Sequence, residues 1–176
     1  MLALIILTNQ SAYAQSKKAR LMLGVGGQAG GYEVAFRGES RPISIQDRTT
    51  VYIAFEGIGN GMGIASGVIL SRVGDPLFKR DKSMATIIIY AAPALISGNL
   101  TVYAGPSFSR WSTGYNGYYY HMSLGWSAGL FLHLGRAHIR FDAHSIRATI
   151  EDSIWRNRIP LKAVNLTAGL GFDILP

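Results

Sequence analysis

The sequence predicts an all-β fold, an antiparallel barrel, and three observations indicate it. Apolar and polar residues alternate with a period of two in about eight separate runs, the pattern of half-buried strands. The connections between these runs alternate between short and long. The composition combines a charged fraction of only 15% with 21 glycines in 176 residues. Such a composition suits strands that have one apolar face and one face of small and polar residues.

The predicted strands differ in how clearly they alternate. The clearest places Trp126 and Leu130 on one face and Ser127 and His133 on the other, with Phe131 as an exception on the polar face. The run at 83–95 is apolar on both faces, so its orientation stays open, and its proline at position 93 predicts that pairing stops or bulges there. The runs extend over 20–30, 50–57, 62–72, 83–95, 100–110, 118–134, 137–145 and 163–172.

The connections between the runs predict how the strands are arranged. Short connections rich in Gly and Asn are typical of tight hairpin turns. Backbone groups cannot stay unpaired in hydrocarbon, so a sheet that crosses a membrane must close on itself. We therefore expect an eight-stranded antiparallel up-and-down transmembrane β-barrel, with short periplasmic turns and long extracellular loops. The short connections are 59–61, 97–99 and 134–136, and the long ones are 31–49, 73–82, 111–117 and 146–162.

The N-terminus resembles an export signal. An apolar run at Leu2–Leu7 is followed by Ala12-Tyr13-Ala14, an A-x-A cleavage pattern. We expect a signal peptide at 1–14 and a single barrel domain at 15–176, located in the outer membrane of a Gram-negative bacterium. No Lys or Arg precedes the apolar run, so the usual positive segment is missing, and a buried first strand is the alternative.

The two faces of the strands predict different environments. The uncharged side that carries Trp126 and Leu130 is expected to face lipid, and the opposite side to face the lumen. Buried charges must be paired, so we expect a structural network in which Arg140 and Asp142, neighbours on one face of the 137–145 run, pair with Glu56 and the histidines. The candidates for this lumen network are Glu56, His133, His138, Arg140 and Asp142, with His121 and His144 also on inward faces. No metal site is predicted.

Two further groups of residues are candidates for contacts with the membrane surface. Aromatic residues near a strand's outer end are expected to form a girdle at the headgroup level, or else to pack a loop: Trp111, Tyr118, Tyr119 and Tyr120. Basic loop residues could contact lipopolysaccharide phosphates or other polyanions, or simply keep exposed loops soluble: Lys79, Arg80, Lys82, Arg156 and Arg158.

The last predicted strand carries a family resemblance. The segment 166–172 alternates and ends in the aromatic Phe172. Together with the export signal and the alternation of short and long connections, it resembles the small outer-membrane barrels that include the OmpA membrane domain, OmpX and the Ail-type adhesins. The resemblance implies outer-membrane lipid and lipopolysaccharide as surroundings, and recognition of Phe172 by the barrel-assembly machinery. The sequence departs from the family pattern by continuing through Asp173–Pro176.

The sequence offers little catalytic chemistry. It has no cysteine, which excludes thiolate metal sites and cysteine catalysis. His144, Ser145 and Glu151 resemble the residues of lipid A deacylases, but that pattern places the serine two positions after the histidine, where Ile146 stands, and then an asparagine, where Arg147 stands. Adjacent strand residues also point to opposite faces.

The net charge of +7 comes from scattered basic residues, which argues against nucleic-acid binding. We expect a monomeric, non-catalytic outer-membrane barrel with a structural or surface-interaction role and no cofactor. The alternatives are a barrel hydrolase that modifies lipid A, and a secreted lipocalin-like protein that binds a hydrophobic ligand. The lipocalin-like alternative would place the large apolar side chains inside.

Overall fold

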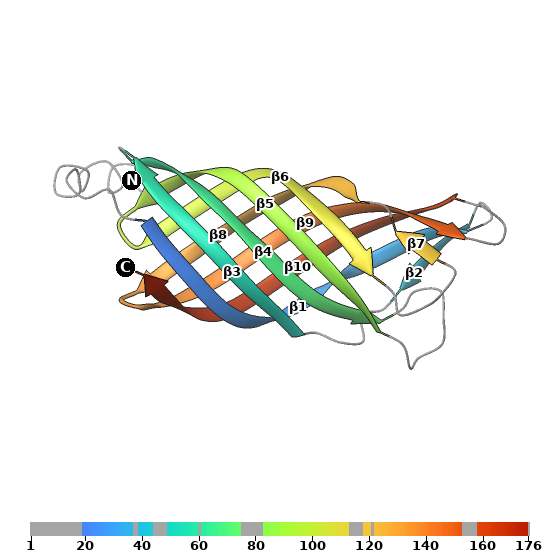
Figure 1. Cartoon of the computed structure of the whole chain (residues 1–176), viewed down its shortest axis with the longest axis horizontal. Coiled ribbons are helices and arrows are strands. Elements are labelled where there is room, and N and C mark those ends of the chain that lie inside the picture. The colour runs from blue at the N-terminus through green and yellow to red at the C-terminus, as the bar shows by residue number, and fades with distance from the viewer. Residues whose placement is uncertain are drawn as a thin grey trace, which may run out of the picture.

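The computed structural model describes residues 19–36, 39–43, 49–59, 61–74, 83–112, 118–120, 122–152 and 158–175, and the predicted signal peptide at 1–14 lies outside them. The described strands form one antiparallel sheet (Figure 1). They are β1 (Ala19–Phe36), β2 (Glu39–Ile43), β3 (Thr49–Gly59), β4 (Met62–Gly74), β5 (Ser83–Ser97), β6 (Leu100–Ser112), β7 (Tyr118–Tyr120), β8 (Ser123–Leu134), β9 (Ala137–Asp152) and β10 (Arg158–Leu175).

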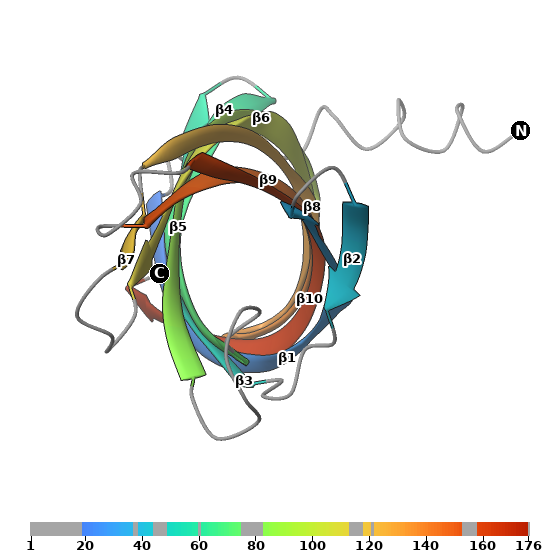
Figure 2. The ribbon, with the colours of Figure 1, turned by 90° about the vertical axis from the view of Figure 1, so that its right-hand side faces the viewer.

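Eight of these strands close into a barrel. Each pairs antiparallel with its neighbours in the order β1, β3, β4, β5, β6, β8, β9 and β10. The ring closes because β10 pairs with β9 on one side and with β1 on the other. Seen from one end, the strands form a complete ring (Figure 2). The predicted eight-stranded antiparallel barrel is confirmed.

The strands extend further at one end than the sequence predicts. Segments 31–36, 146–152 and 158–162 were expected in long loops, but they continue β1, β9 and β10. The short strands β2 and β7 pair there with β1 and β9, so the expected run 118–134 is divided between β7 and β8. Backbone pairing between neighbouring strands continues beyond the point where the apolar and polar residues stop alternating, so the alternation underestimates the strand lengths.

The tight turns and the described chain ends lie at the same end of the barrel (Figure 1). β5 and β6 are joined through Gly98 and Asn99, and β8 and β9 through Gly135 and Arg136. Gly98 and Gly135 have φ values of 59° and 71°. Such left-handed backbone suits glycine, and two-residue turns of this kind match the twist of paired strands. We refer to this end as the tight-turn end.

The barrel is apolar outside and largely polar inside. Leu124 and Trp126 are 60% and 67% exposed, whereas Ser127 between β8's apolar positions is buried. This sidedness contradicts the lipocalin-like alternative, because a soluble barrel would bury the large apolar side chains. No helix in the described part of the chain is long and apolar enough to cross a membrane. Further outward apolar residues are Leu23, Ile53, Phe55, Met62, Leu70, Val102, Phe108, Phe141, Leu166, Leu170 and Phe172.

The orientation of β5, which the sequence leaves open, is set by its neighbours. Tyr90 faces the lumen opposite Gly67 of β4, and Ile89 faces outward. The pairing of β5 with β6 is interrupted between Tyr90 and Ala94 and then resumes in the same register. Pro93 lies in this gap and has no N–H to donate. The strand itself continues to Ser97, so the ladder is interrupted on one side at Pro93 without ending the strand.

Several inward glycines lie beside large lumen side chains. A Cβ added at Gly67 would lie 2.7 Å from the Tyr90 hydroxyl, and one at Gly129 would lie 2.8 Å from the Tyr103 hydroxyl. The Cβ at Gly129 would also overlap the Asp142 carboxylate. Glycine at these positions makes room for rings that fill the barrel, which explains part of the high glycine content.

We predict that Phe141→Arg destabilises the barrel in phospholipid vesicles by about 2–4 kcal/mol, the usual cost of an arginine on the lipid face. Phe141 is half exposed on the outer wall. Urea unfolding followed by gel mobility measures the change, with Phe141→Leu as the matched control. Equal stability of the two variants would show that this wall does not face lipid.

We also predict that Gly129→Ala lowers the free energy of unfolding by about 1–3 kcal/mol, because the added methyl group overpacks the lumen. Gly57→Ala is the control, since a Cβ there meets no atom closer than 3.4 Å, at Phe55. Urea midpoints of the two variants measure the difference. A midpoint for Gly129→Ala that matches the control would contradict the packing argument.

Candidate functional site in the barrel lumen

The centre of the lumen contains a buried ion pair. The Nε of Arg140 donates to one oxygen of Asp142, and the hydroxyl of Tyr103 donates to the other. Thr167 also donates to Asp142, at 3.0 Å. Both members of the pair are buried. A buried carboxylate is costly unless its oxygens are satisfied, and three donors from three strands satisfy this one.

Aromatic rings surround the guanidinium of Arg140. Its central carbon lies 4.5 Å from the ring centroid of Tyr52 and 5.2 Å from those of Tyr90 and Phe131. Tyr103 stacks between Tyr90 and Phe131, with centroids 4.9 Å and 5.7 Å apart. Cation–π contacts of this kind are strongest where water is excluded. These side chains occupy the middle of the barrel, as expected for a lumen of eight strands.

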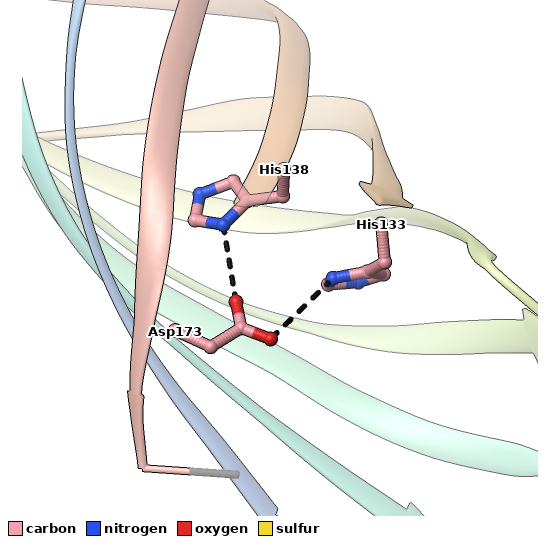
Figure 3. Close-up of side chains that lie close together, drawn as sticks. All are labelled: His133, His138 and Asp173. Carbon is pink, nitrogen blue, oxygen red and sulfur yellow. Dashed lines mark hydrogen bonds and ion pairs between the residues drawn. The ribbon is translucent and has the colours of Figure 1, made fainter. Parts of the chain in front are cut away.

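A second polar cluster lies at the tight-turn end. His133 and His138 are cross-strand partners on either side of the Gly135–Arg136 turn, so both face the lumen. Asp173 of β10 points at both rings (Figure 3). Its carboxylate is 3.1 Å from Nδ1 of His138 and 4.0 Å from Nδ1 of His133. The cluster therefore joins the β8–β9 hairpin to the last strand.

Other side chains surround this cluster. Nε2 of His133 is 3.1 Å from the Glu56 carboxylate, and Nε2 of His138 is 2.8 Å from the Tyr52 hydroxyl. Arg20 lies 3.8 Å from Glu56 and 3.9 Å from Asp173. The structure therefore brings the five candidate lumen residues into the lumen in two groups. One group contains Glu56, His133 and His138 with Arg20 and Asp173. The other contains Arg140 and Asp142, which pair with each other and not with Glu56 and the histidines as expected, because Tyr103 and Thr167 supply the remaining partners of the carboxylate.

Sequence reasoning missed Asp173 and Arg20. Asp173 directly follows the outward Phe172, and alternation therefore points it inward, although it lies beyond the expected end of the last strand. The partnership of His133 and His138 was also missed. Two residues flanking a tight turn at equal distances lie on one face of a hairpin, so the sequence did contain that signal.

The residues of the hydrolase alternative are not brought together. His144 is buried in the lumen, while Ser145 follows it on the other face of β9, and the side chain of Glu151 lies outside the described ones. Nδ1 of His144 is instead 2.7 Å from the hydroxyl of Ser127, which is also buried. This His–Ser pair faces the lumen, whereas Ser145 faces the outer wall.

The surface candidates lie mostly outside the described part of the chain. The backbones of Trp111 and of 118–120 belong to β6 and β7, but their side chains are not among those described, and His121 is not described at all. The same holds for the basic loop residues: Arg158 begins β10 without a described side chain, and Lys79, Arg80, Lys82 and Arg156 lie outside the described residues. The girdle and the loop contacts stay predictions.

Comparison with known proteins places the fold. No protein-family model matches the sequence, and no curated protein matches it. Neisserial surface protein A matches with a TM-score of 0.52 at 12% identity, over 90% of this chain and 100% of its own. The Ail protein of Yersinia pestis matches with a TM-score of 0.49 at 16% identity, over 90% of this chain and 100% of its own. The outer membrane protease OmpT of Escherichia coli matches with a TM-score of 0.31 at 9% identity, over 92% and 98%.

The likeness to neisserial surface protein A shows the fold. The chain shares with that protein the fold of a small closed β-barrel, here with eight antiparallel barrel strands, an apolar exterior and buried polar and aromatic side chains in the lumen.

We predict that Arg140→Met destabilises the barrel by about 3–5 kcal/mol, because it leaves the buried Asp142 without its counter-ion. The double variant Arg140→Met/Asp142→Leu removes both charges and should recover much of that loss. Urea unfolding of the refolded protein measures both values. A double variant no more stable than the single one would show that the pair is not the source of the loss.

Proposed function

We propose that this protein is a non-catalytic barrel of the bacterial outer membrane. Its outer rim, the end of the outer wall away from the tight turns, binds lipopolysaccharide phosphates. The observation that carries the proposal is a pair of basic residues, Arg147 and Lys162, on the outer wall beyond the apolar band. Both side chains are exposed. They are direct partners across β9 and β10, at the end of the barrel away from the tight turns.

The position of this pair supports an anionic ligand. Arg147 follows the outward positions of β9, and Lys162 precedes the outward Val164 and Leu166 on β10. Like charges directly opposite each other on one face of a sheet repel. A phosphate between them would relieve the repulsion and accept charge-assisted hydrogen bonds. Glu33 of β1 is the register partner of Lys162 on the other side of β10.

The remaining expectations are part of the same proposal. The signal peptide at 1–14 exports the chain, the barrel-assembly machinery inserts it, and it works as a monomer surrounded by lipid. The basic residues 79, 80, 82, 156 and 158 add to the anion-binding rim. A catalytic role is disfavoured because His144 and Ser145 lie on opposite faces of β9, and His144 contacts Ser127 instead.

The test is assembly and stability in vesicles with and without lipopolysaccharide. The refolded chain should insert into phospholipid vesicles, run as a heat-modifiable band, and unfold at a higher temperature when lipopolysaccharide is added. Arg147→Gln/Lys162→Gln should insert equally well but lose most of that thermal shift, because the phosphate contacts are gone. Phospholipid without lipopolysaccharide should not distinguish the two proteins.

Arg136→Gln is the matched control, since Arg136 is exposed at the opposite, tight-turn end. It should keep the full shift caused by lipopolysaccharide. An equal shift in the double variant and the control would overturn the phosphate site. A chain that stays in the aqueous fraction without detergent would overturn the membrane assignment itself.

A further inference from the structure

The cluster at the tight-turn end has the composition of a transition-metal site. His133, His138 and Asp173 each offer one ligand atom, and these three atoms lie within 4.8 Å of one another. The ligand atoms of a tetrahedral zinc site lie roughly 3.3 Å apart, given bonds of about 2.0–2.1 Å. The His138–Asp173 distance of 3.1 Å already meets this spacing. We propose that these three residues bind Zn²⁺ or a similar divalent transition metal.

The hydrogen bonds around His133 prepare it as a ligand. A carboxylate only accepts hydrogen bonds, so Nε2 of His133, 3.1 Å from Glu56, carries the proton in the neutral ring. Its Nδ1 then presents a lone pair to the cluster. This buried Nδ1 has no hydrogen-bond partner, and Figure 3 shows it directed at Asp173. A metal ion would satisfy this atom, and the Glu56–His133 contact is the usual carboxylate support of a metal-bound histidine.

His138 has a comparable support. Its Nε2 lies 2.8 Å from the Tyr52 hydroxyl, which either accepts or donates a hydrogen bond. When Nδ1 binds a metal, the ring carries its proton on Nε2 and donates to Tyr52. The third ligand, Asp173, is held beside the turn because its backbone N–H donates to the carbonyl of Arg136 at 2.8 Å.

Arg20 is the group that opposes a cation here. It lies 3.8 Å from Glu56 and 3.9 Å from Asp173, too far for close hydrogen bonds, and its side chain is 17% exposed. One of its terminal nitrogens is buried without a hydrogen-bond partner. In the metal-free protein Arg20 balances the two carboxylates. We expect it to move toward solvent when a divalent ion takes over that role.

The ligand set indicates which metals fit. Two imidazole nitrogens and one carboxylate oxygen suit Zn²⁺, Ni²⁺ or Cu²⁺ better than Ca²⁺ or Mg²⁺, which prefer all-oxygen sites. Three protein ligands leave a fourth position for water. Because the ligands come from β8, β9 and β10, the metal would tie the β8–β9 hairpin to the strand that closes the barrel against β1.

The experiment is titration of the refolded, detergent-solubilised barrel with Zn²⁺ alone, followed by calorimetry and thermal unfolding. The wild type should bind one Zn²⁺ per chain and unfold at a higher temperature, and EDTA should reverse both effects. Asp173→Asn should lose the binding, and so should His133→Gln. His144→Gln is the control, because His144 is a buried lumen histidine that contacts Ser127 instead of this cluster.

Two additional variants test the surrounding groups. Glu56→Gln should weaken binding by about 10–100-fold, as expected for loss of a supporting carboxylate. Arg20→Gln should tighten binding several-fold, because it removes the competing charge. If His133→Gln does not fold, the Co²⁺ absorption spectrum of the wild type and of Asp173→Asn decides the question. Absence of Zn²⁺ binding by the wild type, or undiminished binding by Asp173→Asn, would overturn the proposal.

Discussion

The structure depends on one constraint, the pairing of each of the eight barrel strands with a neighbour on either side. In hydrocarbon an unpaired N–H or C=O costs several kcal/mol, so a sheet in lipid is stable only when it is closed. The contact between β1 and β10 provides the closure and joins residues far apart in the sequence, from Val34 with Leu161 to Leu21 with Leu175. A register shift next to Met22 accompanies the end of this seam.

Closure then separates the two faces of every strand. The outer wall needs only apolar side chains, because its backbone groups are paired within the sheet. The enclosed face is buried, and buried charges must find partners. Arg140 and Asp142 do so in the middle of the barrel, with Tyr103 and Thr167 completing the carboxylate's hydrogen bonds. The filled lumen leaves the ends of the barrel as the places where interactions with other molecules are accessible.

The two ends differ in chemistry. The tight-turn end gathers His133, His138 and Asp173 around buried contacts, whereas the opposite end has the exposed Arg147 and Lys162 on neighbouring strands. One end therefore suits a small cation held by converging side chains, and the other suits an anion approaching from outside. Both groups follow from the period-two alternation of the strands. It points the histidines and Asp173 into the lumen at one end, and it points Arg147 and Lys162 outward at the other.

The sequence by itself determined the number of barrel strands, their antiparallel order and the sidedness of most of them, since these follow from local alternation and turn chemistry. It also identified Glu56, His133, His138, Arg140 and Asp142 as inward residues. Tertiary structure decided which of them meet. Alternation assigns a face, but the distance between Glu56 and His133, or between His138 and Asp173, depends on strand tilt and register around the closed ring. The same closure set the orientation of β5, where both faces are apolar and the neighbouring Gly67 leaves room for Tyr90.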